Sequence, residues 1–431
     1  PPPPPPTPPL HTPPHPPPTT PRLDSSAASD VYKRQEMAWE KVKRNRGAGG
    51  IDGESLKDFE SKLASNLKRL QEELKTDNYR PKPVRQKLIP KPGKPGKRRP
   101  LGIPTIYDRV CQQALVNRLD AIFEPVFDDA SFGYRRRRSA KDAMRKIWCE
   151  LEQGHEWVVD ADLKDFFGSA DHAKLMEMLN QRIADGRVLS LLESMMKVGY
   201  SEDRQVHQSE RGVPQGGVIS PLLSNILLTP FDREMRRKGY RLTRFADDWL
   251  VTCKTRREAQ EALSFASKVL EKLGVVLHEE KTRIVHVRHG FEFLGYKVKR
   301  GMRPLKLPAR KIKIGTQQGA LNVYPRQKSI DHFKDQIRKR TRRKAPLTTK
   351  ALIDEINPII RGWGNYYRKA HVRKLFNQLD RWIVRRLWSH RHKRWRNCGW
   401  RALPHAKVYG ELGLVSLIYL IPSLNRRKAA L

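Results

Sequence analysis

Cysteine is scarce in this sequence, and long apolar runs are missing. The 431 residues include four cysteines, which lie far apart and form no C-x-x-C pair, so a disulfide framework and a zinc knuckle are excluded. The longest apolar stretch, residues 413–421, is about half of the roughly 18 residues that a membrane span requires. We therefore expect a reduced, cytosolic protein without a membrane partner.

Acidic residues are few relative to basic ones. There are 46 Asp and Glu against 86 Lys and Arg, which gives a formal net charge of +40 and a pI of about 10.4. Such a chain attracts polyanions, because each phosphate that it neutralises releases counterions. Nucleic acid is thus the leading partner class. Hydrophobic residues make up 38% of the chain, enough to fill the cores of about two or three domains, so a wholly disordered protein is excluded.

Residues 1–35 differ in composition from the rest of the chain. Residues 1–21 contain 14 of the 32 prolines. We expect this Pro-rich segment to be disordered or not native, and we leave it out of the fold predictions.

Residues 36–300 mix amphipathic helical patterns with short apolar strands, which predicts an α/β or α+β region. Residues 156–163 are predicted as a buried strand, and residues 244–252 as two short strands that meet at an acidic pair. Helical periodicity covers residues 140–151, 174–183 and 258–273.

The acidic pair, Asp247 and Asp248, lies between apolar residues. Two carboxylates at the tip of a buried hairpin are costly unless a cation compensates them. The alternative is an ordinary surface turn, and the pair Asp128 and Asp129, in a loop-like segment, is predicted to be one. The strands on both sides of Asp247 and Asp248 favour a functional site.

A further carboxylate, Asp162, lies at the end of the other predicted strand. Two strands of one sheet that each end in an aspartate can hold a pair of Mg²⁺ ions about 3.5–4 Å apart, which suits in-line phosphoryl displacement. Strand alternation is expected to turn Asp160 to the opposite face, so Asp162 is the predicted ligand.

A glycine-rich turn lies between these carboxylates. Residues 212–217 predict a tight turn that lets the backbone approach a ligand or a packing neighbour, and Ser220-Pro221 predicts the start of a helix. By itself this segment indicates only a turn before a helix.

Eight segments, taken in order, resemble reverse transcriptases of the group II intron type, over roughly residues 45–400. They are Gly49-Gly50-Ile51-Asp52-Gly53, Arg99-Pro100-Leu101-Gly102-Ile103-Pro104, Ser131-Phe132-Gly133-Tyr134-Arg135, the Asp162 strand, Pro214-Gln215-Gly216, Phe245-Ala246-Asp247-Asp248, Glu280-Lys281-Thr282 and Phe293-Leu294-Gly295-Tyr296. The resemblance implies an α+β fold in which the fingers and palm of a right-hand polymerase precede an all-α basic thumb or maturase domain.

The resemblance also implies RNA-directed DNA polymerisation, a nucleotidyl transfer that uses two Mg²⁺ ions, with Mn²⁺ as a substitute. The catalytic and metal-ligating residues would be Asp162, Asp247 and Asp248. The nucleotide-binding residues would be Lys91, Arg99, Phe167, Gln215 and Lys281, with Lys94 or Lys97 as alternatives to Lys91. Phe167 would stack under the incoming sugar and reject a 2′-hydroxyl, so that the product is DNA.

Two departures from the family pattern bear on template positioning. An aspartate usually follows the paired phenylalanines, where this chain has Gly168-Ser169-Ala170, and the usual Phe-Arg-Pro-Gly-Arg-Ser is replaced by residues 134–139, Tyr-Arg-Arg-Arg-Arg-Ser. Neither change removes a predicted metal ligand.

Residues 301–431 are strongly basic, with 32 Lys and Arg against 6 Asp and Glu. Residues 357–368 look like the intron-maturase thumb, after a helix capped by Thr348 or Thr349. The predicted RNA-binding residues are Arg361, Trp363, Asn365, Tyr366, Tyr367 and Arg368. Basic helices with aromatic residues suit phosphate contact and base stacking, although the same rings at helical spacing also suit a hydrophobic core.

The resulting organisation is a Pro-rich segment (1–35), fingers and palm (36–300), a thumb or maturase domain (301–400) and a basic extension (401–431). Expected partners are group II intron RNA, an RNA template with a DNA primer, dNTPs and target DNA, in the bacterial cytoplasm. No HNH nuclease pattern of cysteines and histidines is present, so no DNA-cleaving domain is expected.

Two alternatives remain open. One is a domesticated reverse transcriptase from a retron, a diversity-generating element or a CRISPR-linked defence system, which would lack the segment 363–367. The other is a catalytically silent RNA-binding splicing factor, which would have lost one of the three predicted catalytic aspartates.

Overall fold

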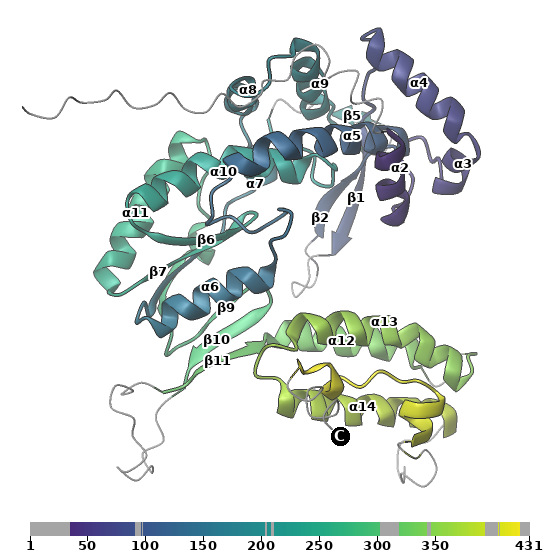
Figure 1. The fold of residues 1–431 in the computed structure, drawn as a ribbon, viewed down its shortest axis with the longest axis vertical. Coiled ribbons are helices and arrows are strands. Elements are labelled where there is room, and N and C mark those ends of the chain that lie inside the picture. Colours follow the sequence, from purple (N-terminus) through teal and green to yellow (C-terminus); the bar gives the residue numbers. More distant parts are fainter. Residues whose placement is uncertain are drawn as a thin grey trace, which may run out of the picture. The chain divides into compact units, whose positions relative to one another are not determined.

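The computed structural model (Figure 1) describes residues 35–90, 96, 98–202, 205–207, 211–301, 319–342, 346–392, 404 and 406–422. The chain divides into two compact units. The first takes its residues from 1–89, 98–127 and 167–229, and the second from 90–97, 128–166 and 230–431.

The described part of the first unit consists of helices and a small four-stranded sheet. The sheet has the order β2-β1-β4-β5, with β1 parallel to β4 and β4 antiparallel to β5. Its strands are β1 (Val84–Pro90), β2 (Arg98–Ile103), β4 (Tyr200–Glu202) and β5 (Gln205–His207). The helices are α2 (Gln35–Arg44), α3 (Leu56–Ser61), α4 (Leu63–Lys75), α5 (Ile106–Phe123), η1 (Glu124–Val126), α7 (Phe166–Ser169), α8 (His172–Asn180), α9 (Gly186–Lys197) and α10 (Ser220–Arg237), which continues into the second unit.

Polar caps begin several of these helices. The hydroxyl of Thr105 accepts the backbone N–H of Asp108 at the start of α5, and Ser55 and Asp58 form a reciprocal capping box on α3. Helix α10 begins at Ser220 and buries its apolar face, as predicted.

An antiparallel sheet, in the order β6-β7-β3-β8, organises the amino-terminal part of the second unit. Its strands are β3 (Trp157–Ala161), β6 (Arg241–Phe245), β7 (Asp248–Cys253) and β8 (Arg283–His286). Helices α6 (Ala140–Glu152) and α11 (Arg256–Lys272) pack against it (Figure 1). The predicted strand and hairpin are therefore confirmed. A 3₁₀ turn, η2 (Glu279–Lys281), precedes β8.

A second sheet and three long helices complete this unit. The sheet has the order β11-β10-β9, formed by β9 (Phe291–Phe293), β10 (Tyr296–Arg300) and β11 (Leu321–Pro325). The helices are α12 (Gln327–Arg340), α13 (Thr349–Tyr367) and α14 (Arg373–His392). Thr348, one of the two predicted caps, caps α13 through the N–H of Ala351. One hydrophobic core joins Val158 and Leu250 of the β6-β7-β3-β8 sheet with Ile353 and Phe376 of the long helices. The α+β prediction is confirmed.

Residues 406–422 pack on the long helices of the same unit. They contain η4 (Ala406–Glu411) and η5 (Ile418–Leu420), and they bury Val408, Leu414 and Leu417 in the shared core. In the part of the chain that the structure describes, no helix is long and apolar enough to cross a membrane.

Candidate active site

The Asp247-Asp248 pair lies in the turn between β6 and β7. Phe245 pairs with Asp248 in the register, so the turn is as tight as a hairpin allows. Ala246 has a left-handed backbone with φ of 61° and is buried. Gly133 lies against this turn, where an added Cβ would come within 2.3 Å of the Ala246 nitrogen. The glycine of the Ser131-Phe132-Gly133 segment is thus needed for the close approach of that segment to the turn.

A buried arginine stabilises this turn through hydrogen bonds. Arg244 donates through Nη1 to the carbonyl oxygen of Ala246 at 2.9 Å, and through Nη2 to the hydroxyl of Ser131 at 2.9 Å. Its Nε and Nη2 also donate to the two oxygens of Asp232 at 2.7 and 2.6 Å. Both charged side chains are 0% exposed, so neither is solvated by water. A buried pair with this geometry fixes the turn that carries the two aspartates.

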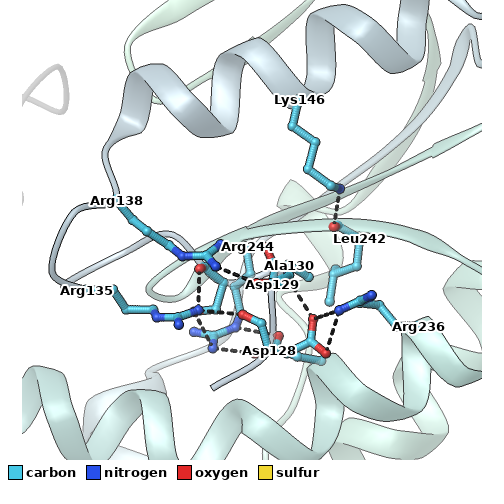
Figure 2. Close-up of polar contacts among 11 residues, drawn as sticks. Asp128, Asp129, Ala130, Arg135, Arg138, Lys146, Arg236, Leu242 and Arg244 are labelled. Atoms are coloured by element: carbon cyan, nitrogen blue, oxygen red, sulfur yellow. Dashed lines mark hydrogen bonds and ion pairs between the residues drawn. The ribbon is translucent and has the colours of Figure 1, made fainter. Parts of the chain in front are cut away.

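The loop before Ser131 is tied to the same region by arginines (Figure 2). The carboxylate of Asp128 accepts two bonds from Arg236 at 3.0 Å, and Asp129 pairs with Arg138. Arg135 donates to the carbonyl oxygen of Asp128 at 2.5 Å. The Asp128-Asp129 pair is therefore structural, as expected. Arg135 and Arg138 take part in this network, and both belong to residues 134–139, the segment that differs from the family pattern.

Asp162 directly follows β3, in the same sheet as the hairpin. Its carbonyl accepts the N–H of His278 at 2.8 Å, and Lys164 donates its N–H to Val276 at 2.8 Å. These bonds hold the loop that leads into η2, where Lys281 donates through Nζ to the Asp162 carboxylate. The structure thus brings two predicted site residues into direct contact.

The carboxylates lie close enough to affect one another's ionisation. Burial raises the pKa of Asp247 above its ordinary value, and the charge of Asp162 adds to the rise. Burial raises the pKa of Asp248 to about 7, helped by Asp247, Asp162 and Asp160 in that order. Asp248 keeps an accessible surface, yet the protein around it excludes enough water for desolvation to be the largest cause. Such a group of acids is compensated well by a divalent cation.

The expectation for Asp160 is wrong. Residues i and i+2 of a strand share a face, so Asp160 lies on the same side as Asp162. Its charge raises the pKa of Asp248, and its carboxylate accepts bonds from Arg283 of β8 at 3.0 and 2.8 Å. Asp160 thus belongs to the electrostatic surroundings of the site, and Arg283 neutralises it.

The donor set suits Mg²⁺, which prefers carboxylate oxygens and binds through one or two of them together with substrate phosphates. Within the described residues, no group of three or more His, Cys, Asp or Glu side chains is drawn together around a single ion position. The Asp162 carboxylate is engaged by Lys281, while Asp247 and Asp248 carry raised pKa values. The chemistry and the charge of these residues fit a magnesium centre that substrate oxygens help to complete.

Three predicted nucleotide-binding residues lie in the first unit. The backbone N–H of Gly102, on the strand that carries the exposed Arg99, donates to the carbonyl of Gln215 at 2.7 Å. Val213 donates its N–H to the carbonyl of the half-buried Phe167 at 2.6 Å. These bonds bring β2, α7 and the glycine-rich turn together. Lys91, Lys94 and Lys97 lie outside the described residues.

The predicted RNA-binding rings of α13 serve packing. Trp363 stacks on Phe333 at 4.6 Å and donates its indole N–H to Ser329 at 3.1 Å. The hydroxyl of Tyr366 donates to the carbonyl of Leu294 at 2.7 Å, and that of Tyr367 donates to the hydroxyl of Ser329 at 2.8 Å. The core alternative for these rings is therefore favoured by their contacts. On the same helix Arg361 is exposed and Asn365 half-buried, and Arg368, also half-buried, follows the helix as its C-cap.

Sequence reasoning missed Arg244 and Asp232. A signal was present, because Arg244 directly precedes Phe245 and the acidic pair in a strand predicted to be buried, and a buried arginine requires an acid. Nothing in the sequence indicated that the acid would be Asp232 of α10.

Two family descriptions match the chain. That of the reverse transcriptase (RNA-dependent DNA polymerase) family matches residues 89–298, and that of the group II intron maturase-specific domain matches residues 330–407. The group II intron-encoded protein LtrA of Lactococcus lactis subsp. cremoris is 30% identical, over 81% of this chain and 70% of LtrA. Protein YkfC of Escherichia coli (strain K12) is 33% identical, over 58% of this chain and 75% of YkfC.

The extent of these similarities argues against the alternative of a retron-type reverse transcriptase. The retron Mx162 reverse transcriptase of Myxococcus xanthus is 31% identical, but over only 31% of this chain. The similarity to LtrA continues over most of the chain, and the maturase-specific match lies outside the polymerase match. The chain therefore belongs to the group II intron-encoded reverse transcriptase/maturase family, as an RNA-directed DNA polymerase that also serves intron splicing and mobility.

Proposed function

We propose that Asp162, Asp247 and Asp248 are the catalytic centre of this polymerase and would hold two Mg²⁺ ions. The observation that supports this most is the convergence of the carboxylates at the ends of β3 and the β6–β7 hairpin, with a raised pKa at Asp247 and at Asp248. When bound, the two ions supply charge stabilisation for the attacking and leaving oxygens of the phosphoryl transfer.

The other residues have roles of binding and orientation. The exposed Arg99 offers a guanidinium to the triphosphate, together with Lys91, Lys94 or Lys97. Phe167 excludes a 2′-hydroxyl by its bulk, and Gln215 orients the nucleotide. Lys281 keeps an ammonium group beside Asp162, where it limits repulsion between the acids before substrate arrives.

We also propose that the carboxy-terminal helices act as a thumb that binds intron RNA, the template with its primer, and target DNA. The rings of Trp363, Tyr366 and Tyr367 hold α13 against α12 and the β9–β10 turn. Arg361 and Arg368 remain as cations for phosphates, with Asn365 between them. RNA affinity would then depend on charge directly and on the rings through the position of the helix.

Primer extension by the full chain on a primed RNA template with dNTPs and Mg²⁺ tests the catalytic assignment. Asp247→Ala should lower the rate at least about 1000-fold, which corresponds to about 4 kcal/mol of lost transition-state stabilisation. Asp354→Ala is the matched control, because Asp354 makes only a surface pair with Lys350 at 2.8 Å. Extension that survives in Asp247→Ala and in Asp162→Ala would refute the assignment. Lost extension with normal salt-sensitive RNA binding would support it.

A further inference from the structure

A cavity of about 570 Å³ lies in the second unit, beside α6 and away from the three aspartates. Its walls include Lys141, Arg145 and Trp148 of α6, Tyr296 of β10, and Lys369 and His371 of the connection between α13 and α14. Its volume is within the range of natural small-ligand sites, about 300–1,000 Å³. None of these residues has a role in the proposed polymerase centre.

Helical spacing places the α6 residues on one face. Positions 141, 145 and 148 follow the i, i+4, i+7 pattern, so their side chains project in the same direction. The opposite wall is fixed by β11, since His371 and Val323 exchange two bonds. The His371 N–H donates to the Val323 carbonyl at 2.8 Å, and the Val323 N–H donates to Nδ1 of His371 at 3.1 Å. The cavity thus lies between a helix face and a connection that is anchored to a strand.

Cations outnumber acids in this cavity. The side chains of Lys141, Arg145 and Lys369 form no hydrogen bond or ion pair within the described residues, and the neighbouring Arg368 has a buried Nε without a partner there. Burial lowers the pKa of Lys141, and repulsion from Arg368 and Lys369 lowers it further. The lining has a single acid, Asp142, which accepts the hydroxyl of Ser139 at 2.6 Å and offsets part of the charge of Lys141, so the cations outnumber it. The site therefore favours an anion.

Aromatic rings lie beside these cations. Trp148 and His371 stack nearly parallel, at 5.7 Å between centroids and 24° between planes. Because Nδ1 of His371 accepts the Val323 N–H, Nε2 is the ring nitrogen that can donate to a ligand. A flat base can extend such a stack, while its phosphate meets the lysines.

We propose that this cavity, which we call the α6 pocket, binds one unpaired nucleotide of an RNA strand, with the base on the Trp148–His371 stack and the phosphate between Lys141 and Lys369. This inference rests on the proposed function in that the strand is an RNA bound by the polymerase. The pocket is a separate anchoring point, which would hold a looped-out or single-stranded segment. A free nucleotide offers the same chemistry, so the test distinguishes the two sources.

Two measurements on the full chain test this proposal. In the first, the affinity of a fluorescein-labelled single-stranded RNA of 12 nucleotides is measured at two salt concentrations. Lys141→Gln/Lys369→Gln should weaken binding about tenfold and reduce the slope of log affinity against log salt by about one. The matched control is Lys254→Gln/Lys268→Gln, which removes two exposed lysines elsewhere in the same unit and should change affinity less than about twofold. Equal losses in both variants would overturn the proposal.

In the second measurement, the same RNA carries 4-thiouridine and is photo-cross-linked to the protein. Adducts on the peptides that contain Trp148 or His371 are expected, and Trp148→Leu should abolish them. Adducts that avoid both peptides would overturn the proposal. Competition by AMP below about millimolar concentration would identify a free nucleotide as the ligand and would overturn the strand assignment.

Primer extension in parallel separates this proposal from the proposed function. Wild-type protein that cross-links at the pocket but fails to extend a primer would count against the polymerase assignment alone. Protein that extends a primer but gives no pocket adduct would refute only the pocket.

Discussion

Arg244 donates a hydrogen bond of 2.9 Å from Nη1 to the carbonyl oxygen of Ala246, the residue that precedes Asp247 in the β6–β7 turn. The same guanidinium is paired with Asp232, and both side chains are 0% exposed. Stability and turn geometry are thus linked through one buried arginine, and substitutions can separate the two.

Arg244→Met should destabilise the protein by about 3–5 kcal/mol, because it leaves Asp232 buried and unpaired. The double variant Arg244→Met/Asp232→Leu replaces the pair by apolar groups and should recover most of that stability. It still lacks the donor to Ala246, so kcat should stay about tenfold low while KM changes little, consistent with one lost charged hydrogen bond. Chemical denaturation and primer-extension kinetics measure the two effects. A double variant with normal kcat would show that the pair acts on stability alone.

The raised pKa of Asp248, about 7, predicts that metal binding depends on pH. Below pH 7 this carboxyl is protonated in the unliganded protein, and a neutral carboxyl is a poor ligand for Mg²⁺. Affinity for Mn²⁺, followed by electron paramagnetic resonance on the full chain, should therefore fall between pH 8 and pH 6. Binding at pH 7 should release protons. In Asp248→Asn the residual binding should vary less with pH over this interval.

The same shift predicts a change in stability without metal. A carboxyl whose folded pKa is raised stabilises the fold while it is protonated, and that contribution is lost as pH rises through about 7. Asp248→Asn should therefore raise the melting temperature of the metal-free protein at pH 8 more than at pH 5. An equal effect at both pH values would mean that the carboxyl titrates normally.

Local pattern was sufficient to predict the strands of the site. The apolar run before Asp162 and the two short runs around Asp247 gave β3 and the β6–β7 hairpin, because buried strands show their burial directly in composition. The helix start at Thr348 followed equally from a local capping signal.

Contacts between distant segments could not be predicted in this way. The partner of Asp160, Arg283, lies far along the chain on another strand, and no local pattern indicates this pairing. The rings of Trp363 and Tyr366 suited RNA stacking and core packing equally well in the sequence, and only their partners in the fold favour packing. Residue type and spacing alone do not show whether such a side chain packs in the core or contacts RNA.

Gly295, in the β9–β10 turn, cannot be replaced without strain. Its φ is +81°, and an added Cβ would come within 2.7 Å of the Tyr367 hydroxyl. Gly295→Ala should cost about 1–2 kcal/mol from the backbone conformation, and more from the displaced tyrosine. Urea denaturation measures the loss. Gly362→Ala is the control, because this helical glycine has open space around it, and the change should stabilise the protein by about 0.5–1 kcal/mol. Equal effects of the two substitutions would contradict this account of the turn.

Asp380 of α14 anchors the segment 406–422. Its carboxylate accepts the hydroxyl of Ser416 at 2.8 Å and the backbone N–H groups of Leu417 and Ile418 at 2.9 and 3.1 Å. Asp380→Ala leaves buried donors without an acceptor and should destabilise the packing of this segment by about 3 kcal/mol or more, at about 1.5–3 kcal/mol for each bond to a charged group.

Hydrogen exchange followed by mass spectrometry measures this effect locally. Peptides from residues 406–422 should lose protection in Asp380→Ala. Peptides from the β6–β7 hairpin should keep theirs, because the hairpin belongs to the β6-β7-β3-β8 sheet, of which residues 406–422 are not a part. Asp335→Ala removes an exposed aspartate from α12 and should change neither region. Unchanged protection at residues 406–422 in Asp380→Ala would mean that burial of Leu414 and Leu417 holds the segment without the carboxylate.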